Sequence, residues 1–279
     1  MNWRRAAIGA AVLVLAACGG GGGSAQTASG PAPSPATQPA GAPPNSGPTT
    51  DPRLSVATGF VANTIAAVPG ARELAALPNG DLLAGTTGSQ LWLVPNAENA
   101  GAAGTAHAFI DLHQGTVNGV AISPDGKTIY AATQTTIFRV SYHAGDQTEP
   151  DASAQAIAHV RTGSIAPHSD GDVHTTTSVG VTTTTVYVGI GSSCNACTEV
   201  DASRAAIWAM NPDGTAFHQI ATRIRNPIAL AIDPASNALW AGGAGQDALA
   251  KGHPYEYMDD VTAHGSSIAD YGWPECEED

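Results

Sequence analysis

The sequence predicts an all-β protein, and two of its features carry that prediction. Only 13% of the 279 residues are charged and 5% are aromatic, with 32 glycines and 19 prolines. A chain with little charge and much Thr, Val, Ala and Gly favours short strands and tight turns, because helical proteins are richer in Glu, Lys and Leu. The second feature is a pair of short apolar segments that recurs along the chain.

Residues 1–18 are predicted to be an export signal. Arg4 and Arg5 supply positive charge, the following ten residues are apolar, and small residues lead to Cys18. This order is typical of a secretory signal peptide, and the apolar run is too short to span a bilayer. Leu-Ala-Ala-Cys resembles the lipobox of bacterial lipoproteins, in which the cysteine is lipidated. We therefore expect a periplasm-facing lipoprotein of the bacterial cell envelope, with an ordinary secretory signal as the alternative.

Residues 19–52 are predicted to be a disordered tether. They consist mainly of Gly, Pro, Ser, Ala and Thr, with almost no large apolar side chain. Such a segment cannot bury enough surface to offset the entropy lost on ordering. The folded domain is therefore expected to occupy residues 53–279.

Four segments of that domain share one plan, in which a short apolar strand, a turn and a second apolar strand follow one another. They are residues 74–84, 120–131, 179–188 and 230–241. Pro-Asn-Gly and Pro-Asp-Gly form the turn in the first two copies, where proline sets one φ and glycine accepts a left-handed conformation. A third strand is expected in three copies, at residues 90–94, 136–140 and 206–210.

The repeat predicts a β-propeller. Leu83, Tyr130, Tyr187 and Trp240 occupy equivalent positions and recur at roughly 50-residue spacing, a period that indicates one blade per unit. Four units are present, whereas a six-bladed ring at this period needs about a hundred more residues. We therefore expect four blades of a six-bladed type, read from an incomplete chain.

The charge balance argues against a nucleic-acid partner. The chain has 11 Lys and Arg against 24 Asp and Glu, for a net charge of −13. Binding to phosphates needs clustered cations, and no basic stripe occurs in this sequence.

One candidate site lies before the third repeat, where His168, Asp170, Asp172 and His174 alternate with other residues. In an extended segment these side chains share one face, which suits a divalent metal or an acid–base pair. A solvated polar loop explains the same spacing. His174 stands out because it immediately precedes a strand, and a neutral imidazole there can accept a proton.

Cys194 and Cys197 form a C-x-x-C pair that can bind a metal, act as a redox dithiol or form a disulfide. Thr198, not a histidine, stands directly after Cys197, which excludes a haem attachment site. Export favours oxidation, so a disulfide between Cys194 and Cys197 is preferred, although Cys276 allows other pairings.

Two further clusters contain charged residues. Arg225 precedes the fourth repeat, and its planar guanidinium suits a carboxylate-bearing ligand, although a surface arginine is the simpler interpretation. The glycine-rich segment before Asp247 and the later Glu256, Asp259 and Asp260 offer oxygen ligands of the kind that calcium takes. A solvated acidic loop accounts for them equally well.

Together these clusters occur in a specific order. His174 with Ser178, the stretch from Tyr187 to Cys197, Arg204-Ala-Ala-Ile-Trp, Arg225-Asn-Pro and Tyr271-Gly-Trp-Pro follow one another. In this order, from about residue 115 to the end, the sequence resembles the glucose/sorbosone dehydrogenase family, and its Ser-Ser-Cys-Asn is typical of the sorbosone branch. Members are six-bladed propellers that oxidise sugars with pyrroloquinoline quinone (PQQ) and calcium. The resemblance implies a small sugar substrate and an external electron acceptor.

The resemblance also assigns roles to individual residues. His174 falls where the family has the general base that takes a proton from the sugar, and Arg225 and Asn226 fall on its cofactor-contacting pair. The carbonyl groups of Gly245 and Gln246 correspond to ligands of the catalytic calcium.

The same resemblance implies a second, structural calcium, with Glu256 and the carbonyl of Tyr271 as ligands.

Three positions depart from the family pattern. Ser192 stands where glucose-oxidising members have an Asp that orients the base, Thr177 replaces a common Arg, and Val117 stands where a polar cofactor contact is expected. These departures leave two alternatives open. One is a non-catalytic propeller that binds a carbohydrate or a protein partner. The other is a metal-dependent, lactonase-like propeller that uses the cluster from His168 to His174.

Overall fold

The computed structural model describes residues 57, 60–99, 101–162, 174–248 and 256–276. The predicted signal peptide with Cys18, the tether at 19–52, and His168, Asp170 and Asp172 lie outside the described residues. The described part of the chain holds strands and two short 3-10 helices, η1 (Asp151–Ser153) and η2 (Val261–His264), and no α-helix. None of its helices is both long and apolar enough to cross a membrane. The all-β prediction is confirmed.

The first two blades are four-stranded antiparallel sheets whose strands follow the order of the chain. The first contains β1 (Ala71–Ala76), β2 (Leu82–Thr86), β3 (Gln90–Val94) and β4 (His107–Asp111). The second contains β5 (Gly119–Ile122), β6 (Thr128–Ala132), β7 (Thr136–Ser141) and β8 (Gln155–His159).

The third and fourth blades depart slightly from this plan. The third contains β9 (Thr177–Val181), β10 (Val186–Ile190), β11 (Ala206–Met210) and β12 (His218–Thr222). A short parallel strand from near the C-terminus, β16 (Ala269–Asp270), pairs with β12. The fourth blade contains β13 (Ala229–Ile232), β14 (Leu239–Gly243) and β15 (Tyr257–Asp260).

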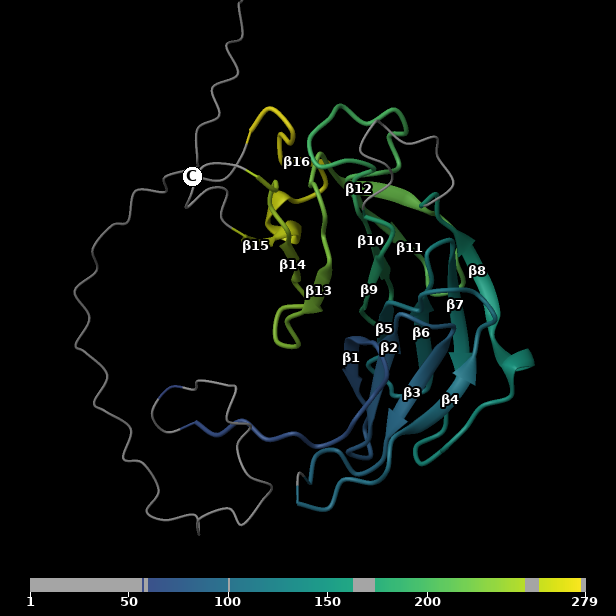
Figure 1. Ribbon diagram of the computed structural model, residues 1–279. Helices are drawn as coiled ribbons and strands as arrows, with labels where there is room; N and C mark the ends of the chain where they lie inside the picture. Colours follow the sequence, from purple (N-terminus) through teal and green to yellow (C-terminus); the bar gives the residue numbers. More distant parts are fainter. Residues whose placement is uncertain (1–56, 58–59, 100, 163–173, 249–255, 277–279) are drawn as a thin grey trace, which may run out of the picture. The chain divides into compact units, whose positions relative to one another are not determined.

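The blades lie side by side as in a β-propeller, which confirms the predicted architecture. The first strands of the blades, β1, β5, β9 and β13, are consecutive neighbours (Figure 1). A separate apolar core fills each space between adjacent blades; examples of its residues are Leu83 and Ile129, then Ile137 and Val188, then Ile207 and Leu239. Burial of each such side chain stabilises the folded state by about 1.5–3 kcal/mol.

The strand register confirms the predicted repeat. Each of the four equivalent residues pairs with the next-to-last residue of the first strand in its blade; the pairs are Leu83 with Ala75, Tyr130 with Ala121, Tyr187 with Gly180, and Trp240 with Ala231. Gly80 and Gly126 have φ angles of 85° and 69°, as the turn chemistry predicts. The outer strands β4, β8 and β12 were not located from the sequence because they lack a clear apolar pattern. The residues of β8, for instance, are all exposed or half-buried.

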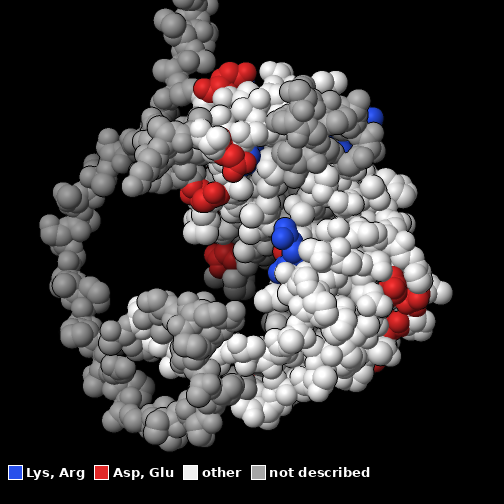
Figure 2. Space-filling view, in the orientation of Figure 1, with Lys and Arg blue, Asp and Glu red and all other residues white. Residues whose placement is uncertain are grey.

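The described surface carries few charges, and acidic groups are more numerous than basic ones on the face shown in Figure 2. Most of that face is uncharged.

Candidate functional site

One end of the third and fourth blades collects the residues singled out in the sequence. His174 precedes β9, Ser192 follows β10, and Arg225 precedes β13. The first residue of β9, Thr177, pairs with the last residue of β10, Ile190, so both connections emerge at the same end. The N–H of Ser192 donates to the carbonyl of Arg225 at 2.7 Å. The hydroxyl of Ser178 donates to the carbonyl of Pro227 at 2.6 Å, which further ties β9 to the segment before β13.

His174 is held through its Nδ1 atom. That nitrogen lies 2.8 Å from Oγ of Ser192 and 3.1 Å from the carbonyl oxygen of the same residue. The Ser192 hydroxyl donates its proton to the carbonyl of Cys194 at 2.8 Å. Both atoms facing Nδ1 are therefore acceptors, so Nδ1 carries the proton and Nε2 keeps the free lone pair.

The environment also keeps this imidazole neutral. Burial, followed by the nearby positive charge of Arg225, lowers the pKa of His174 from 6.5 to about 4. A charged imidazolium is disfavoured where water is excluded and a cation lies close by. At neutral pH the side chain is therefore an unprotonated base.

Arg225 is a buried cation, with 3% of its surface exposed. Its Nε donates to the carbonyl of Asn195 at 2.9 Å, Nη1 to the carbonyl of Ala244 at 2.9 Å, and Nη2 to Oδ1 of Asn195 at 2.7 Å. Nη2 also lies 3.1 Å from the carboxylate of Asp247, which is 81% exposed. A buried guanidinium with mostly neutral partners retains its attraction for an anionic group.

Arg204, which the sequence did not identify as a site residue, holds the backbone around His174. Its side chain is 1% exposed. Nε donates to the carbonyl of Gly191 at 2.7 Å, and Nη2 to those of His174 and Ser192 at 3.1 and 3.0 Å. The guanidinium thus fixes the backbone on both sides of the His174–Ser192 contact. Because arginine is common on surfaces, its position before an apolar strand did not distinguish it.

Gly191 allows the two predicted site residues His174 and Asn226 to approach each other. A Cβ at this position would lie 2.5 Å from Oδ1 of Asn226 and 2.5 Å from Cβ of His174. Asn226 is itself buried, and its carbonyl accepts the N–H groups of Ile228 and Ala244. His174, Arg225 and Asn226 are therefore brought together in one place.

The residues expected to bind calcium are brought together only in part. Oε2 of Glu256 accepts the N–H of Gly245 at 3.2 Å, which links one residue from each expected calcium site. Gln246 is half-buried beside them. The hydroxyl of Tyr271 donates to Asp259 on β15 at 2.6 Å. Burial, followed by this hydrogen bond, raises the pKa of Tyr271.

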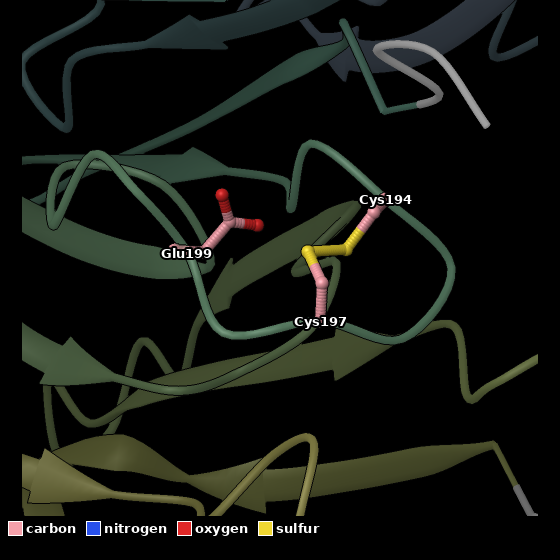
Figure 3. Close-up of side chains that lie close together, drawn as sticks. All are labelled: Cys194, Cys197 and Glu199. Atoms are coloured by element: carbon pink, nitrogen blue, oxygen red, sulfur yellow. A yellow bond between two sulfur atoms is a disulfide. The ribbon is translucent and has the colours of Figure 1, made fainter. Parts of the chain in front are cut away.

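Cys194 and Cys197 form a disulfide in the structure. The carboxylate of Glu199 lies next to the two sulfur atoms (Figure 3). Glu199 accepts both the N–H and the hydroxyl of Ser193, each at 2.7 Å. With both sulfurs in a disulfide, no thiolate is available here as a metal ligand.

The three departures from the family pattern have different surroundings. Ser192 contacts His174 directly. Val117 is fully buried in the core between the first two blades, so its side chain serves packing. Thr177 is also fully buried, and among the residues that the structure describes its Oγ1 has no hydrogen-bond partner.

No curated protein sequence is a significant match. Among solved structures, the PQQ domain of a pyranose dehydrogenase from Coprinopsis cinerea, in its holo form, is similar at 17% identity and a TM-score of 0.64, over 79% of this chain and 58% of that chain. A Trichoderma reesei member of carbohydrate-active enzyme family AA12 is similar at 20% identity and a TM-score of 0.59, over 75% and 56%.

A third similar structure is the PQQ-bound aldose sugar dehydrogenase of Streptomyces coelicolor, at 20% identity and a TM-score of 0.53, over 77% of this chain and 66% of that chain. The chain therefore spans less than two thirds of the length of these structures, and the likeness shows the shared propeller fold. The family resemblance expected from the order of motifs is also confirmed, because the TrAA12-like family model matches residues 54–277. The chain belongs to the TrAA12-like family.

Proposed function

We propose that the protein oxidises a small sugar, of the aldose or sorbosone type, with PQQ and calcium, and passes the electrons to an external acceptor. The observation that carries this proposal is the pairing of a neutral base with a fixed cation. His174 keeps a free Nε2 lone pair, and the charge of Arg225 is held close enough to lower the pKa of that histidine. The family membership and the PQQ-containing structural neighbours support the same function.

The residues present suit both groups. PQQ carries carboxylates, and Arg225 is a buried guanidinium whose partners are neutral apart from the exposed Asp247. Calcium takes carboxylate and carbonyl oxygens. The carbonyls of Gly245 and Gln246 would supply them for the catalytic ion, and Glu256 with the carbonyl of Tyr271 for a second, structural ion. When bound, PQQ would accept a hydride from the sugar, and calcium would polarise the quinone.

The protein's own contribution is binding, orientation and proton transfer. Arg225 and Asn226 would hold the cofactor through charge and hydrogen bonds. Nε2 of His174 would take the proton from the sugar hydroxyl, while Nδ1–H remains bonded to Ser192. Arg204 keeps the backbone of both residues in place, so the base needs no rearrangement before it acts.

Reconstitution of the purified protein tests this proposal. PQQ and CaCl2 are added, a panel of aldoses and sorbosone is supplied, and reduction of an artificial dye is followed. We expect turnover by the wild type and a loss of about 100-fold or more in His174→Gln. His218→Gln is the matched control, because His218 is an exposed histidine on β12 and its replacement should leave the rate unchanged. Absence of dye reduction by the wild type with every sugar would contradict the proposal, and cofactor-free hydrolysis of a lactone would favour a lactonase.

We further propose that Cys18 anchors the protein to a bacterial membrane through a lipid. The lipobox-like Leu-Ala-Ala-Cys and the tether at 19–52 support this assignment. Metabolic labelling with a fatty acid should mark the wild type and not Cys18→Ser. Equal labelling of both proteins, or none of either, would refute the anchor.

A further inference from the structure

The disulfide between Cys194 and Cys197 closes a short turn that contacts both halves of the candidate site. On one side, the carbonyl of Cys194 accepts the hydroxyl proton of Ser192, which orients His174. On the other side, Asn195 within the turn contacts Arg225. The same four-residue turn therefore contacts both Ser192, the hydrogen-bond partner of His174, and Arg225.

Asn195 contacts Arg225 through two neutral oxygen atoms. Its backbone carbonyl accepts Nε at 2.9 Å and its Oδ1 accepts Nη2 at 2.7 Å, so one residue receives two N–H groups of the guanidinium. This arrangement resembles the bidentate grip of a carboxylate on arginine. Because the acceptors are uncharged, they orient the guanidinium without neutralising it.

Asn195 also reaches the segment that follows β14. Its Oδ1 accepts the N–H of Asp247 at 2.8 Å, and its Nδ2 donates to the carbonyl of Asp247 at 3.1 Å. The residues just before Asp247 are Gly245 and Gln246, the expected calcium ligands. One side chain thus aligns the cation and the oxygen-rich segment with each other.

We propose that Asn195, held by the Cys194–Cys197 disulfide, is a positioning residue that sets the affinity of the site for an anionic cofactor. The disulfide confines the turn to few conformations, and this presents both oxygens of Asn195 to Arg225 at once. An aspartate could still accept from Nη2, but it would compensate the charge of the arginine and lose the amide hydrogen bond to the carbonyl of Asp247. The neutral amide orients Arg225 and adds no second negative charge beside the exposed carboxylate of Asp247.

Two readouts test this proposal, and only the second depends on the proposed function. The first is the hydrogen exchange of the Arg225 Nη2 protons, one of which is donated to Oδ1 of Asn195, in the cofactor-free protein, measured by NMR and assigned with Arg225→Lys. The second is the Kd for PQQ in the presence of CaCl2, measured by fluorescence quenching. If the wild type binds no PQQ, the proposed function fails, and the exchange measurement still decides whether Asn195 and the disulfide hold the arginine.

Asn195→Ala and the double variant Cys194→Ser with Cys197→Ser should each speed the exchange and weaken PQQ binding by about tenfold or more. Asn195→Asp keeps an oxygen that accepts from Nη2, so it should keep the Nη2 protons protected and still weaken PQQ binding, since the added carboxylate competes with the anionic cofactor. A purely structural role would not separate the two readouts in this way. Asn211→Ala is the matched control, because Asn211 secures the turn after β11 through Thr215. Unchanged exchange and unchanged affinity in Asn195→Ala would overturn the proposal, as would PQQ binding by Asn195→Asp at the wild-type Kd.

Discussion

Nδ1 of His174 lies 2.8 Å from the hydroxyl oxygen of Ser192, whose proton is already donated to the carbonyl of Cys194. This arrangement determines the tautomer of the histidine, since Ser192 can only accept from Nδ1. A neutral serine, unlike a carboxylate, adds no negative charge beside the imidazole. The hydrogen bond to the Ser192 carbonyl raises the pKa of His174, but burial outweighs it.

The pH profile of kcat/KM should reflect the lowered pKa of His174. His174 acts as a base only when neutral, and burial lowers its pKa to about 4. The rate should therefore stay high as the pH falls below 6.5 and decline only near pH 4, as the imidazole becomes protonated. Dye-reduction assays between pH 3.5 and 8 provide the test, with circular dichroism at each pH to verify folding. An acid limb centred near pH 6.5 in folded protein would contradict the assignment.

Ser192→Asp should shift the acid limb of the kcat/KM profile to higher pH. A carboxylate beside Nδ1 favours the protonated imidazole, which raises a histidine pKa by about 1–3 units. We expect the acid limb of kcat/KM to shift by at least one unit towards neutral pH. Ser192→Ala serves as the control, since it removes the hydroxyl without adding charge and leaves the backbone acceptor at 3.1 Å. Equal profiles for the Asp and Ala variants would show that Ser192 does not govern the base.

Gly191→Ala should disrupt the site by steric contact. The added methyl group would lie 2.5 Å from both Asn226 Oδ1 and His174 Cβ, so these side chains must move apart. We expect activity to fall at least tenfold, and overpacking to cost about 1–3 kcal/mol of stability. Gly115→Ala is the matched control, because a Cβ there meets no atom within 4 Å. Wild-type activity in Gly191→Ala would show that the close approach of His174 and Asn226 is dispensable.

Glu73 should make stability fall with rising pH. This residue of β1 accepts a hydrogen bond from Asn118 at 3.3 Å, and burial raises its pKa from 4.5 to about 8. Because the pKa is higher in the folded state, its contribution to stability is fully present below pH 4.5 and is lost as the pH rises towards 8.

Glu73→Gln keeps a neutral side chain at every pH, so its melting temperature should exceed that of the wild type at pH 8 by at least about 2–4 °C. The two proteins should melt together at pH 4.5, and calorimetry at both pH values provides the comparison. Glu98→Gln, at an exposed position, should show no such difference. A stabilisation of Glu73→Gln that is the same at both pH values would exclude ionisation of Glu73 as its cause.

The sequence by itself determined the blades and the identity of the key residues. Short apolar segments joined by Pro-Asn-Gly and Pro-Asp-Gly turns located the inner strands, because strand alternation and turn conformation depend on neighbouring residues. The order of motifs pointed to His174, Arg225 and Asn226. The outer strands were missed because they lie outside the repeated pairs of apolar segments and bury few residues: β8 has none that is buried, and β12 has one.

Only the tertiary structure decided how these residues act together. Asn195 contacts Arg225 across 30 positions of the chain, and Arg204 reaches His174 from another connection of the same blade. Such contacts join loops that emerge at one end of neighbouring sheets, so their residues leave no periodic signal in the sequence. The packing of the blades places Val117 in the core. It also fixes the proton on Nδ1 of His174 and brings the two neutral oxygens of Asn195 to Arg225.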